Sequence, residues 1–162
     1  FEEVAHLLLK GELPTSGQLK EFSALERSKR ALSEKMHAAI QLYPKNAHPM
    51  DTIRTSVSYA GMEDPRVWDN TPETNLDKAI SLLAKIPTQI AADYRVRKGK
   101  APIAPKAELS ICENFFHMCF GEVPHRDIVK AFEVSMVLYA EHSFNASTFT
   151  SRVVASTTSD LY

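Results

Sequence analysis

Three polar side chains near the end of the sequence could together bind a small carboxylic acid. They are His142, Asn145 and Ser147, and they stand in a run of small polar residues with almost no charge. An imidazole, an amide and a hydroxyl can hold the carbonyl and carboxylate oxygens of such an acid. A helix end beside them would add oriented N–H groups for the same anion. The alternative is that His142 ends a helix and the polar residues cap it, and spacing alone favours this structural interpretation.

Other chemically capable residues form weaker patterns. Cys112 and Cys119 are about two helical turns apart on one helix face, whereas His117 points elsewhere, so core cysteines are favoured over a zinc site. The triplet from Asn145 to Ser147 matches the N-glycosylation acceptor pattern, but nothing else indicates secretion. There is no glycine-rich phosphate loop and no nucleophile elbow. The sequence therefore predicts no metal site.

Composition limits the class of protein rather than its activity. The chain has 162 residues, of which 44% are hydrophobic, and this is enough for one sizeable core. A formal net charge of −1 gives no electrostatic reason to expect nucleic acid or an anionic membrane surface as a partner. Two cysteines are too few for a disulfide framework, and no apolar run approaches the roughly 18 residues needed to cross a bilayer. We therefore expect a cytoplasmic protein that binds neither nucleic acid nor membranes.

The elements that must position the polar run are predicted to be helices, because apolar residues recur at helical spacing and no hairpin signal appears. Thr15 and Gln18 form a capping-box pattern, and Pro87 predicts a kink within one long helix. The last helix before the polar run has apolar residues on nearly all sides, which predicts deep burial. The expected helices lie around Phe1–Leu8, Thr15–Leu25, Leu32–Tyr43, His48–Gly61, Leu76–Tyr94, Leu109–Cys119 and Arg126–Ala140. The predicted fold class is all-α.

Two polar stretches are expected to be surface connections. The first runs from Gly61, which should end a helix, to Thr74, and it contains two prolines. The second is the basic stretch from Arg95 to Lys100. Its cations could contact phosphates, but a solvated turn is the favoured interpretation.

The polar run and several earlier segments resemble the citrate synthase family. The run from Tyr139 to Val153 reads Tyr-Ala-Glu-His-Ser-Phe-Asn-Ala-Ser-Thr-Phe-Thr-Ser-Arg-Val, and it is similar to the motif of bacterial 2-methylcitrate synthases and their citrate synthase relatives. Other segments are similar to the family in the same order, namely Phe1–Thr15, Ala47–Thr55, Leu83–Arg95 and Ser159–Tyr162. The resemblance spans essentially the whole chain.

The resemblance implies that residues 1–162 are a fragment of the large helical domain of the citrate synthase fold. An N-terminal segment, the small domain and the remaining C-terminal part would then lie outside this sequence. The start at Phe1 rather than methionine, and the lack of a closing signal before Tyr162, lead to the same expectation.

The implied activity is that of an acyltransferase of the tricarboxylic acid cycle or of propionate metabolism. It condenses propionyl-CoA or acetyl-CoA with oxaloacetate and water to give 2-methylcitrate or citrate plus CoA. The CoA thioester is a substrate, so no cofactor is expected. The run around His142 favours 2-methylcitrate synthase.

By the same resemblance, His142 and Asn145 bind oxaloacetate, and Ser147 is a weaker member of that site. The catalytic His and Asp of the family, and its carboxylate-binding arginines, are expected beyond Tyr162. No catalytic residue is therefore assigned within this chain, Arg152 is given no role, and the fragment alone is expected to be inactive.

The family also implies a homodimer. The best interface candidates are the helices at His48–Ala60 and Leu76–Tyr94, which are apolar enough to need a partner. The alternative to an enzyme is a non-catalytic all-α dimerisation or scaffold module. That alternative explains the helices but leaves the His142 motif without a reason.

Overall fold

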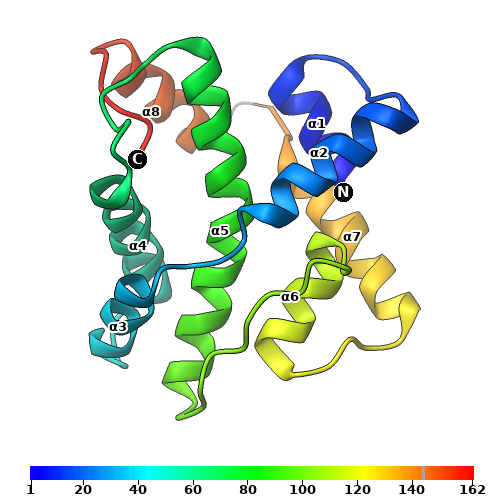
Figure 1. Cartoon of the computed structure of the whole chain (residues 1–162), viewed down its shortest axis with the longest axis vertical. Coiled ribbons are helices and arrows are strands. Elements are labelled where there is room, and N and C mark those ends of the chain that lie inside the picture. The colour runs from blue at the N-terminus through cyan, green and yellow to red at the C-terminus, as the bar shows by residue number, and fades with distance from the viewer. Residues whose placement is uncertain (144) are drawn as a thin grey trace.

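The computed structural model describes residues 1–143 and 145–162, and it confirms the all-α prediction for this part of the chain. Figure 1 shows the arrangement of the helices. They are α1 (Glu2–Lys10), α2 (Ser16–Ser28), α3 (Glu34–Leu42), α4 (Pro49–Glu63), α5 (Pro72–Arg97), α6 (Ile111–Phe120), α7 (Arg126–Ala140) and α8 (Ala146–Ala155). None of the helices described is both long and apolar enough to cross a membrane.

The long helix α5 is the centre of the arrangement. It packs against α2, α3, α4 and α6 (Figure 1). Buried alanines at positions 84, 91 and 92 lie along it, and such small side chains let neighbouring helices approach closely. Pro87 lies inside this helix without dividing it, as the sequence pattern predicted for one long helix.

Local signals set several helix ends, and the capping box of α2 forms as predicted. Thr15 accepts the backbone N–H of Gln18, and the Gln18 side chain accepts the backbone N–H of Thr15, which completes the capping box of α2. Gly11 and Gly121 end α1 and α6 with φ angles of 86° and 91°. Glycine adopts this left-handed conformation without a steric cost from Cβ. These helix ends therefore follow from short stretches of sequence.

The prediction that Gly61 ends a helix is wrong, because α4 continues to Glu63. Gly61 is buried against the last residue of the chain, and a Cβ atom at this position would lie 2.7 Å from the Cβ of Tyr162. The hydroxyl of Tyr162 also donates to Oδ2 of Asp64 at 2.7 Å. The missing side chain of Gly61 therefore makes room for a distant aromatic ring.

The basic stretch at the end of α5 is only partly a solvated turn, which corrects the favoured interpretation. Arg97 still belongs to the helix and is partly buried. Its guanidinium donates to Asp93 at 2.6 Å and to the hydroxyl of Thr52 at 2.8 Å. It also donates to the backbone carbonyls of Lys45 and Ala47. Arg97 therefore links the α3–α4 connection to α5. The cluster of charges in the sequence did not indicate this structural role.

The prediction that the Arg126–Ala140 helix is deeply buried is also wrong. The helix α7 forms over these residues, but within the described part of the chain none of its side chains is buried. Val134 and Leu138 are 46% and 68% exposed. The helix packs mainly against α1 and α6, so its neighbours cover one side (Figure 1). An apolar pattern predicts deep burial only where neighbours surround the helix, and here they do not.

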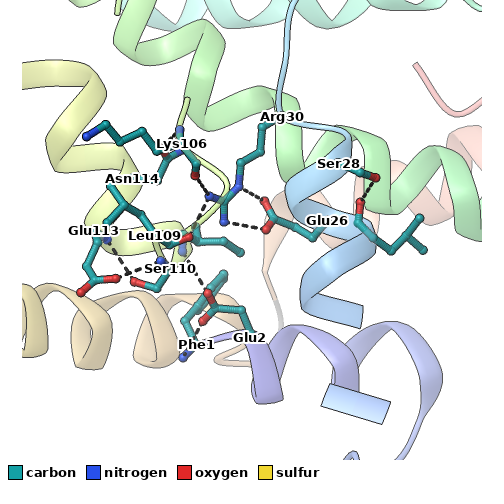
Figure 2. A network of polar contacts seen from close by, with 12 residues as sticks. Phe1, Glu2, Glu26, Ser28, Arg30, Lys106, Leu109, Ser110, Glu113 and Asn114 are labelled. Carbon is teal, nitrogen blue, oxygen red and sulfur yellow. Dashed lines mark hydrogen bonds and ion pairs between the residues drawn. The ribbon is translucent and has the colours of Figure 1, made fainter. Parts of the chain in front are cut away.

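A buried ion pair joins the end of α2 to the loop before α6 (Figure 2). Arg30 and Glu26 are only 2% and 1% exposed. Two hydrogen bonds of 2.8 and 2.7 Å connect the guanidinium to both carboxylate oxygens. The third nitrogen, Nη1, donates to the carbonyls of Lys106 and Leu109, each at 2.9 Å. These partners satisfy a charge that would otherwise be costly to bury.

The same loop is held at several other points (Figure 2). The backbone N–H of Lys106 donates to Oδ1 of Asn114 at 2.8 Å. Glu2 of α1 accepts the backbone N–H of Ile111 at 2.9 Å, while Ser110 begins the capping box of α6. The loop therefore connects α1, α2 and α6 into one polar network.

Asp77 of α5 lies between two cations. Its carboxylate pairs with Arg66 at 2.6 Å and with Lys29 at 2.7 Å. The hydrogen bond from Arg66, and then that from Lys29, lower the pKa of Asp77 and outweigh the opposing effect of partial burial. Because the pKa is lower in the folded state, Asp77 adds stability above its unfolded pKa, and this stability is lost as the pH falls through the folded value.

We expect Asp77→Asn to cost about 1 kcal/mol of stability at neutral pH. Below about pH 4, where an unfolded aspartate takes up its proton, the variant should lose less further stability than the wild type. Urea unfolding at a series of pH values measures both effects. Asp127→Asn is a control, because Asp127 is an exposed carboxylate on α7. An Asp77→Asn variant with the full acid sensitivity of the wild type would contradict this assignment.

Candidate functional site

The three predicted site residues lie at the junction of α7 and α8. The helix α7 ends at Ala140, His142 follows in the connection, and Asn145 immediately precedes α8. Ser147 lies in the first turn of α8. The structure therefore places all three within one short segment, while Phe144 of the same motif lies outside the described residues.

Asn145 is the N-cap of α8. Its Oδ1 atom accepts the backbone N–H of Ser147 at 2.8 Å and that of Thr148 at 3.3 Å. A capping oxygen satisfies N–H groups that have no partner within the helix. The structural interpretation from sequence was thus right that a polar residue caps a helix here. It was wrong about His142, because α7 ends at Ala140 and His142 lies in the connection that follows.

His142 is exposed and contacts the capping residue. Its Nε2 atom lies 3.2 Å from Nδ2 of Asn145. The neighbouring backbone forms a tight turn in which Glu141 accepts the N–H of Ser143 at 2.6 Å. Ser143 has a φ angle of 66°, a left-handed conformation that is uncommon outside glycine. This turn carries the chain from α7 to α8 and presents the imidazole beside the α8 N-terminus.

An open hollow of about 1080 Å³ lies along α8 beside these residues. Its lining includes Asn145, Thr148 and Arg152, together with the exposed apolar side chains of Phe149 and Val153. Ligand sites for small molecules are usually enclosed clefts. The hollow is instead a broad, partly apolar surface with polar groups at the N-terminus of α8. Such an open surface could form one wall of a ligand site if further residues enclosed it.

Sequence reasoning missed the lining residues Thr148, Phe149 and Arg152. The signal that could have found them is helical spacing from the cap, because Asn145, Phe149 and Arg152 lie on one face of a helix at intervals of four and three residues. Arg152 is the only cation among the described lining residues. It shares this surface with Asn145, whereas His142 and Ser147 are not among the described lining residues.

The two cysteines are core residues, as predicted. Both are buried and neither forms a disulfide. Burial, the largest cause, raises the pKa of each thiol to about 11. Both are therefore neutral at physiological pH and poor nucleophiles. In the described residues, no group of three or more His, Cys, Asp or Glu side chains could hold a metal ion.

The family model described as "Citrate synthase, C-terminal domain" matches residues 1–162. A protein named citrate synthase from Mycolicibacterium smegmatis is 52% identical over 162 residues, which cover 100% of this chain and 43% of that protein. A protein named 2-methylcitrate synthase from Mycobacterium tuberculosis is 51% identical over the same length, covering 100% of this chain and 41% of that protein.

A solved structure agrees with these matches. The crystal structure of citrate synthase from Pyrobaculum aerophilum has a TM-score of 0.92 and 32% identity to this chain. The match covers 99% of this chain and 42% of that one. The chain therefore spans about two fifths of the length of the relatives it matches.

Proposed function

Because the chain belongs to the citrate synthase family, we propose that it is part of a longer enzyme that joins an acyl-CoA to oxaloacetate. In this reaction the carbon next to the thioester attacks the ketone of oxaloacetate, and hydrolysis of the thioester releases CoA. The products are citrate or 2-methylcitrate. The observation that carries the proposal is the family match over the whole chain. It also argues against a non-catalytic scaffold, which gives no reason for the His142 motif.

We propose that this chain supplies one wall of the oxaloacetate site. His142 and Asn145 lie together at the N-terminus of α8, where the helix dipole favours an anion. Ser147, in the first turn of the helix, is a weaker candidate contact. The carboxylate base and the hydrogen-bond donor that act on the acyl-CoA would come from residues beyond Tyr162. In this scheme the chain binds and orients one substrate without completing the reaction.

The acyl donor is either acetyl-CoA or propionyl-CoA, and the matched relatives carry both names. The two donors differ by one methylene, which a pocket distinguishes by only about 1–3 kcal/mol. We propose propionyl-CoA as the preferred donor, on the resemblance of the His142 run to 2-methylcitrate synthases. No step of the proposed mechanism depends on this choice.

We propose a cytoplasmic homodimer. Met50 and Met62 are exposed on α4, and Tyr94 is exposed near the end of α5. Pairing of such surfaces about a two-fold axis would remove them from water. The two free cysteines suit a reducing compartment.

A thiol-release assay tests the enzyme assignment. The complete gene product should release CoA from propionyl-CoA and acetyl-CoA only when oxaloacetate is present, and the ratio of the two kcat/KM values identifies the preferred donor. The 162-residue chain assayed alone should show no turnover. Clear turnover by this chain would contradict the placement of the catalytic groups beyond Tyr162. Absence of oxaloacetate-dependent release by the complete gene product would overturn the proposed function.

A further inference from the structure

The capping of α8 fixes the orientation of the Asn145 amide. Its oxygen accepts two backbone N–H groups, from Ser147 and Thr148. A backbone N–H can only donate, so an oxygen must face the helix. This partner set decides the orientation of an amide whose oxygen and nitrogen are otherwise hard to distinguish. The Nδ2 group of Asn145 must therefore point away from α8.

In that direction Nδ2 meets the ring of His142, with 3.2 Å between Nδ2 and Nε2. An amide nitrogen carries two donors and accepts nothing, so Nε2 must be the acceptor of this hydrogen bond. A neutral imidazole that accepts at Nε2 carries its proton on Nδ1. We propose that Asn145 is a positioning residue, which sets this tautomer of His142 and so makes its Nδ1–H the group that donates to oxaloacetate.

The tautomer matters because the ligand of the proposed function, on which this inference rests, is an anion. Within the described residues Nδ1 of His142 has no hydrogen-bond partner, and the side chain is exposed. In the assigned tautomer Nδ1 offers an N–H to a carboxylate or ketone oxygen. In the other tautomer it would present a lone pair to that oxygen, which is repulsive. The residue that caps α8 thus decides whether Nδ1 of His142 attracts or repels an anionic oxygen.

Two substitutions separate this role from capping. Asn145→Asp and Asn145→Ser both keep an oxygen that caps a helix well, and both remove the Nδ2 donor. The aspartate can accept from Nε2–H, so it should move the proton of His142 from Nδ1 to Nε2. The serine removes the same donor without adding a negative charge. Ser151→Ala, further along α8, is the matched control. All three variants should keep the melting temperature of the wild type.

Long-range ¹⁵N–¹H correlation spectra of the ¹⁵N-histidine-labelled complete gene product report the protonated nitrogen. They are recorded at about pH 8.5, roughly two units above an ordinary histidine pKa of about 6.5. The His142 signal is assigned by its loss in His142→Gln. We expect an Nδ1-protonated ring in the wild type and Ser151→Ala, and an Nε2-protonated ring as the major form in both Asn145 variants. An Nε2-protonated ring in the wild type, or an unchanged ring in the Asn145 variants, would overturn the proposal.

Calorimetric titration with oxaloacetate distinguishes this proposal from the function on which it rests. Affinity should fall about tenfold or more in Asn145→Ser, as for the loss of a hydrogen bond to a charged group. Equal binding by the wild type and Asn145→Ser would overturn the positioning role and leave the proposed function intact. No binding of oxaloacetate by the wild type would overturn the proposed function. It would also overturn the proposal that Nδ1–H of His142 donates to oxaloacetate.

Discussion

Replacing Arg30 with methionine should lower the free energy of unfolding by about 3–5 kcal/mol. The substitution would leave the buried carboxylate of Glu26 without its cation. It would also leave the carbonyls of Lys106 and Leu109 without the donor that they share. An uncompensated charge in the interior costs far more than a missing pair at the surface.

Urea unfolding followed by circular dichroism measures this loss as a lower midpoint. Arg54→Met is the matched control, because it removes an ion pair with Asp51 whose side chains are 80% and 52% exposed. It should change stability by no more than about 1 kcal/mol. The double variant Glu26→Leu/Arg30→Met should regain part of the stability, since it removes both buried charges but leaves the two carbonyls without a donor. If Arg30→Met cost no more than Arg54→Met, the buried pair would not have the role assigned to it.

Replacing His142 with alanine should lower kcat/KM of the complete enzyme about 10²- to 10³-fold, as for the loss of one aligned donor to a reacting anion. The imidazole is exposed and its described hydrogen bond is to Asn145. The substitution should therefore change stability by no more than about 0.5 kcal/mol. Steady-state rates with oxaloacetate varied at saturating acyl-CoA measure the loss of activity, and thermal unfolding measures the stability.

His125→Ala is the matched control for this prediction. His125 is also an exposed histidine at a helix end, where its Nδ1 accepts the backbone N–H of Asp127 at 3.4 Å. It lies at the start of α7, whereas His142 follows its end. Its removal should leave the rate within about twofold of the wild type. A His142→Ala enzyme as active as His125→Ala would show that oxaloacetate binds elsewhere.

Much of the fold was predictable because helix formation is decided over a few residues. The capping box at Thr15 acts within one turn, so the sequence pattern located this end. Burial of α7 was not predictable in the same way, because it depends on which helices lie beside it. The pair of Glu26 and Arg30 was hidden for a related reason. At a spacing of four residues such a pair usually lies on a helix surface, whereas here the pair is buried and a distant loop bonds to it.

The candidate site was predictable in position but not in geometry. His142 and Asn145 are close in sequence, so their proximity required no knowledge of the fold. The helix α8 was missed because its hydroxyl-bearing and β-branched residues are modest helix formers. Its one clear signal was Asn145 as a possible N-cap. The hydrogen bond from that cap to the imidazole depends on a turn through Ser143 that the sequence pattern did not reveal.

The position of Arg30 also has a consequence during synthesis of the protein on the ribosome. Its carbonyl partners lie 76 and 79 residues later in the chain. At a translation rate of about 5–20 residues per second, these partners follow Arg30 by about 4–16 s. During that interval Glu26 is the only one of these hydrogen-bond partners that has been synthesised, so the polar network at the end of α2 cannot yet be complete. The N-terminal part of the fold can therefore be completed only after residues 106–109 have left the ribosome.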